Sequence, residues 1–189
     1  YPKPITTKPN KSHDVYPYLL KGLHIQQPDQ VWSVDITYLK MKRGVMYLVA
    51  LIDVYSRYIV DWVLVNTLEA EHSVAMLKRA LAKKQPQILN SDQGCQFTCK
   101  LWISTLKAHD VQISMDGKGS WRDNVFIERL CRTVKYEDIY LRAYNSVSEV
   151  KTGLNRYFNF YNNRRPHSSL DGKTPDQVYF NKLPQLKAA

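Results

Sequence analysis

Three acidic residues from distant segments have the types and spacing that metal-dependent chemistry on phosphodiesters requires. Asp35 lies in VWSVDITYL, Asp92 in NSDQGCQF and Glu128 in GSWRDNVFIERL, with thirty-five residues between the second and third acids. Two-metal phosphoryl transfer uses a few carboxylates to hold two divalent ions about 4 Å apart, against the attacking and leaving oxygens. The pattern predicts that these three carboxylates meet in one site.

Each acid also has an ordinary structural explanation. Glu128 and Arg132 could form an i,i+4 pair on an exposed helix face, worth a few tenths of a kcal/mol, roughly. Asp92 precedes Gln93-Gly94 and could simply begin a turn. Taken separately, none of the acids identifies a site, and the functional interpretation depends on the three together.

Asp35 also has a structural explanation, and two other aspartates could take its proposed role as a metal ligand. A mid-strand acid can be a charge on an edge strand, but Val34 and Ile36 place Asp35 in an apolar strand, where an unpaired charge is costly. A divalent ion would remove that cost. Asp53 and Asp61 also lie in apolar surroundings, and spacing alone does not exclude either of them from the same role.

The elements that must position these acids follow from hydrophobic periodicity. Strands are expected at 31–41, 45–55, 58–65, 87–90 and 111–115. Helices are expected from an Asn66–Glu69 capping box to about 84, at 97–108, from near 123, and from a Ser146–Glu149 cap to Pro166. Three strands in an antiparallel meander followed by alternating helices and strands predict an α/β fold with a mixed sheet of about five strands, flanked by helices.

The predicted helix that begins near Asp123 has one polar face. Asn124, Glu128, Arg132 and Lys135 recur at helical spacing and share that face, while Ile127, Cys131 and Val134 form an apolar stripe that would pack on the sheet. A carboxylate flanked by cations suits a metal ligand beside a phosphate backbone. The residues that we expect to contact DNA are Asn124, Arg132, Lys135, Lys118, Arg122, Arg164 and Arg165.

Composition favours a polyanionic partner. The chain has 27 Lys and Arg residues against 17 Asp and Glu residues, a net charge of +10, and such an excess favours binding to phosphates. Residues 118–165 hold ten basic and five acidic residues. No apolar run approaches the ~20 residues of a membrane span, and no secretory signal is recognisable. The three cysteines show no paired metal-ligand spacing and are expected to be reduced thiols in a cytosolic protein.

Five motifs in order resemble the catalytic half (OrfB) of bacterial insertion-sequence transposases of the IS-three family. They are VWSVDITYLK, YLVALIDVYSRYIVDW, NSDQGCQF, GKGSWRDNVFIERL and YNNRRPHSSLDGKTPDQVY. The resemblance implies the RNase H-like fold of retroviral integrase cores. It also implies that Asp35, Asp92 and Glu128 are a DDE triad that is both catalytic and metal-binding, with two Mg²⁺ or Mn²⁺ ions per active site. Asn90, Arg122, Val125 and Arg129 depart from the usual family pattern without removing a carboxylate.

The resemblance further implies DNA 3′-end cleavage and strand transfer during transposition. The partners would be double-stranded DNA, both the terminal inverted repeats of the element and the target, and a second copy of the chain. The protein would act in the bacterial cytoplasm, on the nucleoid when bound to DNA, and an N-terminal helix-turn-helix and coiled-coil module would be encoded upstream or missing from this chain. The alternatives are an RNase H-like nuclease and an inactive DNA-binding or assembly module.

The expected organisation has three parts. Residues 1–29 would be a basic, proline-containing arm or linker, residues 30–170 the catalytic core, and residues 171–189 a C-terminal tail. The prolines of the arm are Pro2, Pro4, Pro9, Pro17 and Pro28.

Overall fold

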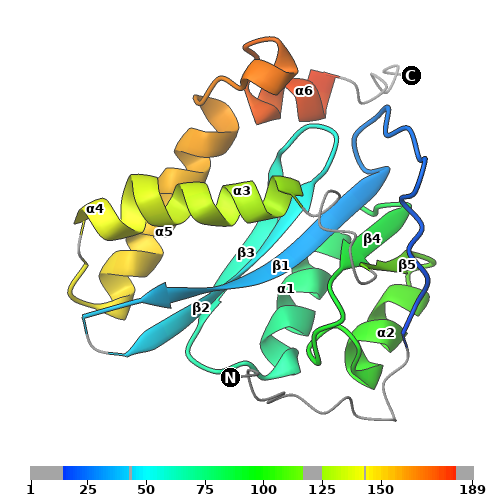
Figure 1. The fold of residues 1–189 in the computed structure, drawn as a ribbon, viewed down its shortest axis with the longest axis horizontal. Helices are drawn as coiled ribbons and strands as arrows, with labels where there is room; N and C mark the ends of the chain where they lie inside the picture. Colours follow the sequence, from blue (N-terminus) through cyan, green and yellow to red (C-terminus); the bar gives the residue numbers. More distant parts are fainter. Residues whose placement is uncertain (1–14, 43, 117–124, 143, 182–189) are drawn as a thin grey trace, which may run out of the picture.

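A five-stranded mixed sheet forms the centre of the computed structural model, which describes residues 15–42, 44–116, 125–142 and 144–181 (Figure 1). The spatial order of the strands is β3-β2-β1-β4-β5. Their bounds are β1 Val31–Lys40, β2 Val45–Asp53, β3 Ile59–Val65, β4 Ile88–Ser91 and β5 Gln112–Met115. The first three are antiparallel neighbours, while β4 pairs in parallel with β1 and β5 with β4. The predicted fold class is confirmed.

Helices cover both faces of the sheet, as Figure 1 shows. Their bounds are α1 Ala70–Leu81, α2 Lys100–Lys107, α3 Val125–Val134, α4 Tyr140–Arg142, α5 Val147–Asn163 and α6 Pro175–Asn181. One hydrophobic cluster packs α1 and α2 against the sheet, and a second packs α3 and α5 against it. Because strand side chains alternate between faces, β1 and β2 contribute residues to both clusters.

Two of the predicted helix starts differ from the observed ones. Helix α1 begins at Ala70, and its N-cap Glu69 makes no side-chain capping bond. Asn66 is therefore too far from the first turn, and the predicted capping box is wrong. Helix α2 begins at Lys100 rather than at Phe97, because the Phe97 amide bonds to the Gly94 carbonyl in a preceding turn. The cap of α5 is confirmed, since the Ser146 hydroxyl accepts from the Glu149 amide at 3.2 Å.

The helix that carries Glu128 is longer than α3 alone. It continues through a π-helical turn, η1 (Lys135–Ile139), into α4. The predicted apolar stripe of α3 is confirmed, because Ile127, Cys131 and Val134 are all buried. This continuous element packs on the sheet and α5 and thereby fixes the position of Glu128.

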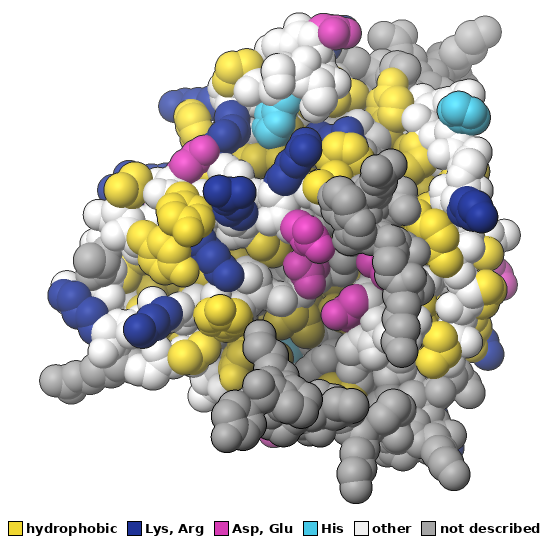
Figure 2. Space-filling view, viewed as in Figure 1, with side chains coloured by type: hydrophobic (Ala, Val, Ile, Leu, Met, Phe, Trp, Pro, Cys, Tyr) yellow, Lys and Arg dark blue, Asp and Glu magenta, His cyan; other side chains and the backbone are white. Residues whose placement is uncertain are grey.

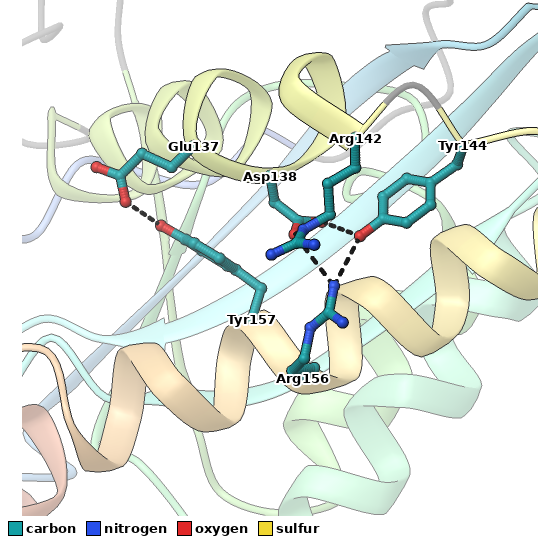
Figure 3. A network of polar contacts seen from close by, with 6 residues as sticks. All are labelled: Glu137, Asp138, Arg142, Tyr144, Arg156 and Tyr157. Atoms are coloured by element: carbon teal, nitrogen blue, oxygen red, sulfur yellow. Dashed lines mark hydrogen bonds and ion pairs between the residues drawn. The ribbon is translucent and has the colours of Figure 1, made fainter.

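A polar network joins the far end of this helix to α5 (Figure 3). The buried Asp138 carboxylate accepts hydrogen bonds from Arg142 Nε at 3.0 Å and from the Tyr144 hydroxyl at 2.9 Å. Arg156 of α5 reaches the same hydroxyl at 3.3 Å. The Tyr157 hydroxyl donates to Glu137 at 2.9 Å. Asp138 is thus a buried charge with partners, which is the condition under which such burial is tolerated.

The segment after residue 170 contains a helix where we expected only a tail. After a short 3-10 turn, η2 (Ser168–Leu170), the chain reverses through Asp171 and Gly172, both at positive φ, into α6. The ring of Tyr179 stacks on Tyr58 at 4.5 Å, and its hydroxyl donates to Asp29 at 2.5 Å. This packing places α6 over the turn between β2 and β3. Of the helices in the described ranges, none is long and apolar enough to span a bilayer.

Candidate active site

Asp35 occupies the middle of β1, opposite Ala50 of β2. One carboxylate oxygen accepts a hydrogen bond from the amide of Ile36 at 2.8 Å, and the other lies 3.9 Å from Sγ of Cys131 on α3. The pKa of Asp35 is raised to about 7, mainly by burial and to a smaller extent by the nearby carboxylates of Asp92 and Glu128, against the lowering effect of the Ile36 amide. Proximity of like charges therefore links all three predicted acids.

Asp92 follows directly after β4 and is exposed. Its Oδ1 accepts a hydrogen bond from the Gly94 amide at 2.9 Å, so the Asp-initiated turn expected from the sequence is present. A Cβ at position 94 would lie 2.9 Å from Asp92 Oδ1 and 3.2 Å from Gln96 Oε1. Gly94 thus leaves the space in which the Asp92 carboxylate sits.

Glu128 lies in the first turn of α3 and is exposed, while its helix neighbours Ile127 and Cys131 are buried. Asp35 and Glu128 line one open pocket of about 440 Å³. Asp92 lines an adjoining pocket, and Tyr38 contributes to both. Figure 2 shows acidic side chains gathered near the middle of this face, with Lys and Arg side chains beside them.

The three acids line two pockets that share Tyr38, and they do not by themselves form a three-ligand cage. Among the described residues, no group of three His, Cys, Asp or Glu side chains is placed so that it could jointly hold a metal ion. Mg²⁺ does not require such a cage, because it is commonly bound by one or two carboxylates together with water and substrate phosphates. Asp35 is a half-buried carboxyl group whose pKa is raised by burial and then by two like charges, and such an oxygen ligand fits a hard divalent cation.

Two of the predicted DNA-contacting cations flank the acids. Arg132 and Lys135 line the same pocket as Asp35 and Glu128. The Arg132 guanidinium lies 5.9 Å from the ring centre of Tyr136, and Lys135 Nζ lies 4.5 Å from that of Tyr38. Arg132 and Lys135 thus contact uncharged rings, and both keep their positive charge within the pocket that the acids line.

Of the other predicted DNA-contacting residues, the structure describes Arg164 and Arg165. Arg164 is the exposed C-cap of α5. Arg165 forms a bidentate ion pair with Glu137 and also donates to the Tyr157 hydroxyl at 3.1 Å, so a contact with phosphate would have to compete with that pair. Lys118, Arg122 and Asn124 lie outside the described residues.

The structure gives the two competing aspartates other partners. Asp53 is buried and accepts hydrogen bonds from the Ser56 amide and hydroxyl and from the Asp29 amide, at 2.6–2.8 Å. It therefore organises the turn after β2. Asp61 forms a two-bond ion pair with Arg79 of α1. Neither is among the residues lining the pocket that contains Asp35 and Glu128.

Two residues of the site were not singled out from the sequence. Tyr38 connects the two acidic pockets, and Cys131 places its thiol against Asp35. The spacing of Cys131 from Glu128, three residues on one helix, already placed it beside that acid. No pattern in the sequence indicated a contact with β1.

Comparison with known proteins identifies the family of the chain. Residues 25–120 and residues 109–175 each match the family described as integrase core domain. The chain belongs to the integrase core family. It is 36% identical over 152 residues to the transposase of insertion sequence IS904 from Lactococcus lactis, covering 78% of this chain and 60% of that protein. It is 32% identical over 163 residues to the transposase InsF of IS3A from Escherichia coli, covering 84% and 57%.

The chain therefore spans little more than half the length of these relatives, and the predicted kinship with IS-three transposases is confirmed. Solved structures agree on the fold. The HTLV-2 integrase catalytic core, described in complex with magnesium, superposes with a TM-score of 0.66 at 18% identity, covering 81% of this chain and 97% of that one. A simian T-cell lymphotropic virus intasome chain gives a TM-score of 0.73 at 17% identity, covering 94% and 62%.

Proposed function

We propose that this integrase core is the catalytic part of a DDE transposase. It would hydrolyse one phosphodiester at each end of a mobile element and then join the released 3′-hydroxyl to target DNA. In each step an oxygen nucleophile attacks phosphorus, one P–O bond forms and one breaks. The kinship with insertion-sequence transposases, established over most of the chain, supports this reaction class.

The observation that carries the proposal is the electrostatic convergence on Asp35. Asp35 on β1 and Glu128 at the start of α3 line one pocket. The pKa of Asp35 is raised first by burial, and then by the carboxylates of Asp92 and Glu128. Among the described residues, none of the three carboxylates has an ion-pair partner, and like-charged groups held close together favour the binding of a cation. Two other acids, Asp61 and Asp138, each have an arginine partner.

We propose that Asp35, Asp92 and Glu128 hold two Mg²⁺ or Mn²⁺ ions. When bound, such ions polarise a phosphodiester and lower the pKa of a bound nucleophile. The Gly94 amide orients Asp92, and the Ile36 amide orients Asp35. Packing of Cys131 on β1 sets the helix from which Glu128 extends.

The cations beside the acids would bind the DNA strand that enters the site. Arg132 and Lys135 lie one and two helical turns after Glu128, and both line its pocket. A phosphate there would meet Arg132, Lys135 and the Glu128 carboxylate on the helix side and the Asp35 carboxylate on the strand side. We therefore propose that Arg132 and Lys135 orient the scissile strand. Arg164 would contact the DNA backbone farther from the acids.

The proposed partners are double-stranded DNA, comprising element ends and target, and a second copy of the chain, because joining two ends requires two active sites. The match covers 60% of the IS904 transposase. We propose that a DNA-binding module encoded upstream of this chain acts together with it. The proposed site of action is the bacterial cytoplasm.

The test is a strand-transfer assay with purified protein, Mg²⁺ and a duplex that carries the ends of the element. We expect 3′-end cleavage and joined products from the wild-type chain, and neither from Asp92→Asn. The control is Asp61→Asn, which removes a carboxylate that pairs with Arg79 instead and should remain active. Cleavage confined to RNA–DNA hybrids would favour the nuclease alternative. DNA binding without processing under any divalent ion would favour an assembly module.

A further inference from the structure

A second cationic pocket lies beside the proposed active site and is lined by segments that the proposed chemistry does not use. The turn between β2 and β3 contributes Tyr55 and Arg57, the start of α3 contributes Phe126, and the segment from η2 to α6 contributes Ser169, Lys173 and Gln177. The pocket measures about 470 Å³. In Figure 1 the β2–β3 turn reaches toward α6, with the start of α3 beside it.

Arg57 is the central cation of this pocket. Its guanidinium lies 3.3 Å from the ring centre of Phe126, and its side chain is partly buried. Among the described residues, no carboxylate pairs with it. Burial lowers the pKa of Arg57 to about 10, so the group remains charged at neutral pH. A desolvated guanidinium without a carboxylate partner is a ready binding group for an anion.

The backbone at Arg57 supports a functional reading. Its φ is +65°, a conformation that glycine adopts freely and that an arginine adopts at a cost. The turn is held by the Arg57 amide, which donates to the Asp53 carbonyl at 2.9 Å, and by the bonds from Ser56 to the Asp53 carboxylate. A side chain that is kept at a strained position, with no structural ion pair, suggests a role beyond forming the turn.

The opposite wall supplies further hydrogen-bond donors. The Gln177 carbonyl oxygen accepts from the Thr174 amide at 3.1 Å, which leaves its NH₂ group as the end that can donate. The Lys173 ammonium is exposed and has no ion-pair partner within the described ranges. Asp171 is the acid of the lining, so Arg57 and Lys173 leave the pocket with a net positive charge. Guanidinium, ammonium, amide and the Ser169 hydroxyl together suit a phosphate group.

We propose that this pocket binds a backbone phosphate of the DNA strand that flanks the scissile bond. The inference rests on the proposed function, because it places DNA at Glu128. Phe126, which backs Arg57, lies two residues before Glu128, about 3 Å along the helix axis. A strand that is seated on the three acids and continues past the start of α3 would bring a neighbouring phosphate to the pocket. The SSLDGKTP segment would then serve to build one wall of a DNA contact.

The test measures binding of the full chain to a duplex in the presence of EDTA, as a function of salt concentration. Arg57→Gly removes the guanidinium and suits the positive φ, so the turn should be retained. We expect about tenfold weaker binding and a slope of log K against log salt that is smaller by about one. Lys173→Ala should reduce the slope in the same direction, and Arg57→Lys should fall between wild type and Arg57→Gly.

The charge-matched control is Lys84→Ala. Lys84 follows α1 on the other side of the sheet, and its loss should leave both affinity and slope at wild-type values. Thermal melting of each variant separates loss of binding from loss of folding. A competition arm with inorganic phosphate, at ionic strength matched with chloride, distinguishes free phosphate from DNA. We expect only weak competition.

Two results would overturn the inference. If wild-type protein cleaves DNA while Arg57→Gly and Lys173→Ala bind the duplex with unchanged affinity and slope, the pocket is not a DNA contact, although the proposed function stands. If the binding of inorganic phosphate depends on Arg57 and the binding of the duplex does not, DNA is not the ligand of this pocket. Absence of both DNA binding and processing in the wild-type chain would remove the proposed function together with the pocket.

Discussion

Cys131 Sγ on α3 lies 3.9 Å from a carboxylate oxygen of Asp35 on β1. This contact seats the helix that carries Glu128 against the strand that carries the first acid. Because Cys131 and Glu128 are three residues apart, they lie on neighbouring parts of one helix face. The buried thiol anchors the helix, and the exposed carboxylate lines the pocket.

Asp35 should make the metal-free protein less stable as pH rises. Its pKa in the folded chain is about 7, against 3.8 for the ordinary group, so folding favours the protonated form. The cost is absent below about pH 4, grows between pH 4 and 7, and is complete above 7. The shift of about three pKa units corresponds to roughly 4 kcal/mol. Partial solvent access reduces our expectation to about 1–2 kcal/mol.

Denaturant unfolding in EDTA checks this expectation. Asp35→Asn should exceed wild type in unfolding free energy at about pH 8 and match it at about pH 4. Asp61→Asn is the control, since it loses the ion pair with Arg79 and should gain nothing at high pH. A constant difference between Asp35→Asn and wild type across the pH range would contradict the assigned environment of Asp35.

Gly94→Ala should impair activity more than stability. The new Cβ would lie 2.9 Å from Asp92 Oδ1, and the flexible carboxylate can move away at little cost to folding. That movement displaces a proposed metal ligand. We expect unfolding free energy to change by less than about 1 kcal/mol and DNA cleavage to fall by about tenfold or more. If the Gly94→Ala variant cleaved DNA at the wild-type rate at several Mg²⁺ concentrations, the position of Asp92 would be unimportant for activity.

Gly153→Ala should destabilise the fold through a contact far from the acids. Gly153 is buried in α5, and a Cβ there would lie 2.0 Å from the Tyr144 hydroxyl oxygen. The tyrosine would have to move, which would break its 2.9 Å hydrogen bond to Asp138. We expect a loss of about 1–3 kcal/mol, as for other overpacked sites. In a Tyr144→Ala background, which removes both the hydroxyl and the ring carbons that the new Cβ would meet, Gly153→Ala should cost much less; an undiminished cost would argue against this clash.

The sheet and most of the helices follow from periodicity, because their buried faces repeat at two or at about 3.6 residues. Alternation in β1 and the continuous apolar run of β2 predicted the meander, and Pro166 marked the end of α5. Helix α6 was missed because it is only seven residues long and depends on tertiary contacts, chiefly Tyr179 with Tyr58 and Asp29. Short helices have little intrinsic stability.

The candidate site was predictable in part. The spacing of the acids and their motifs singled out Asp35, Asp92 and Glu128, but sequence alone did not exclude Asp53 or Asp61. Only the hydrogen bonds from Ser56 and the ion pair with Arg79 assign those two to structural roles. The ion pair of Arg165 with Glu137 and the contact of Arg57 with Phe126 likewise join segments that are distant in sequence.

The most direct test of the central claim is a crystal structure of the chain soaked in Mn²⁺, with the ions located by anomalous scattering. We expect manganese peaks in contact with the carboxylates of Asp35, Asp92 and Glu128, and their loss from crystals of Asp92→Asn. Ions bound elsewhere, or peaks that persist unchanged when Asp92 is replaced, would contradict the assignment of these three residues as one metal site.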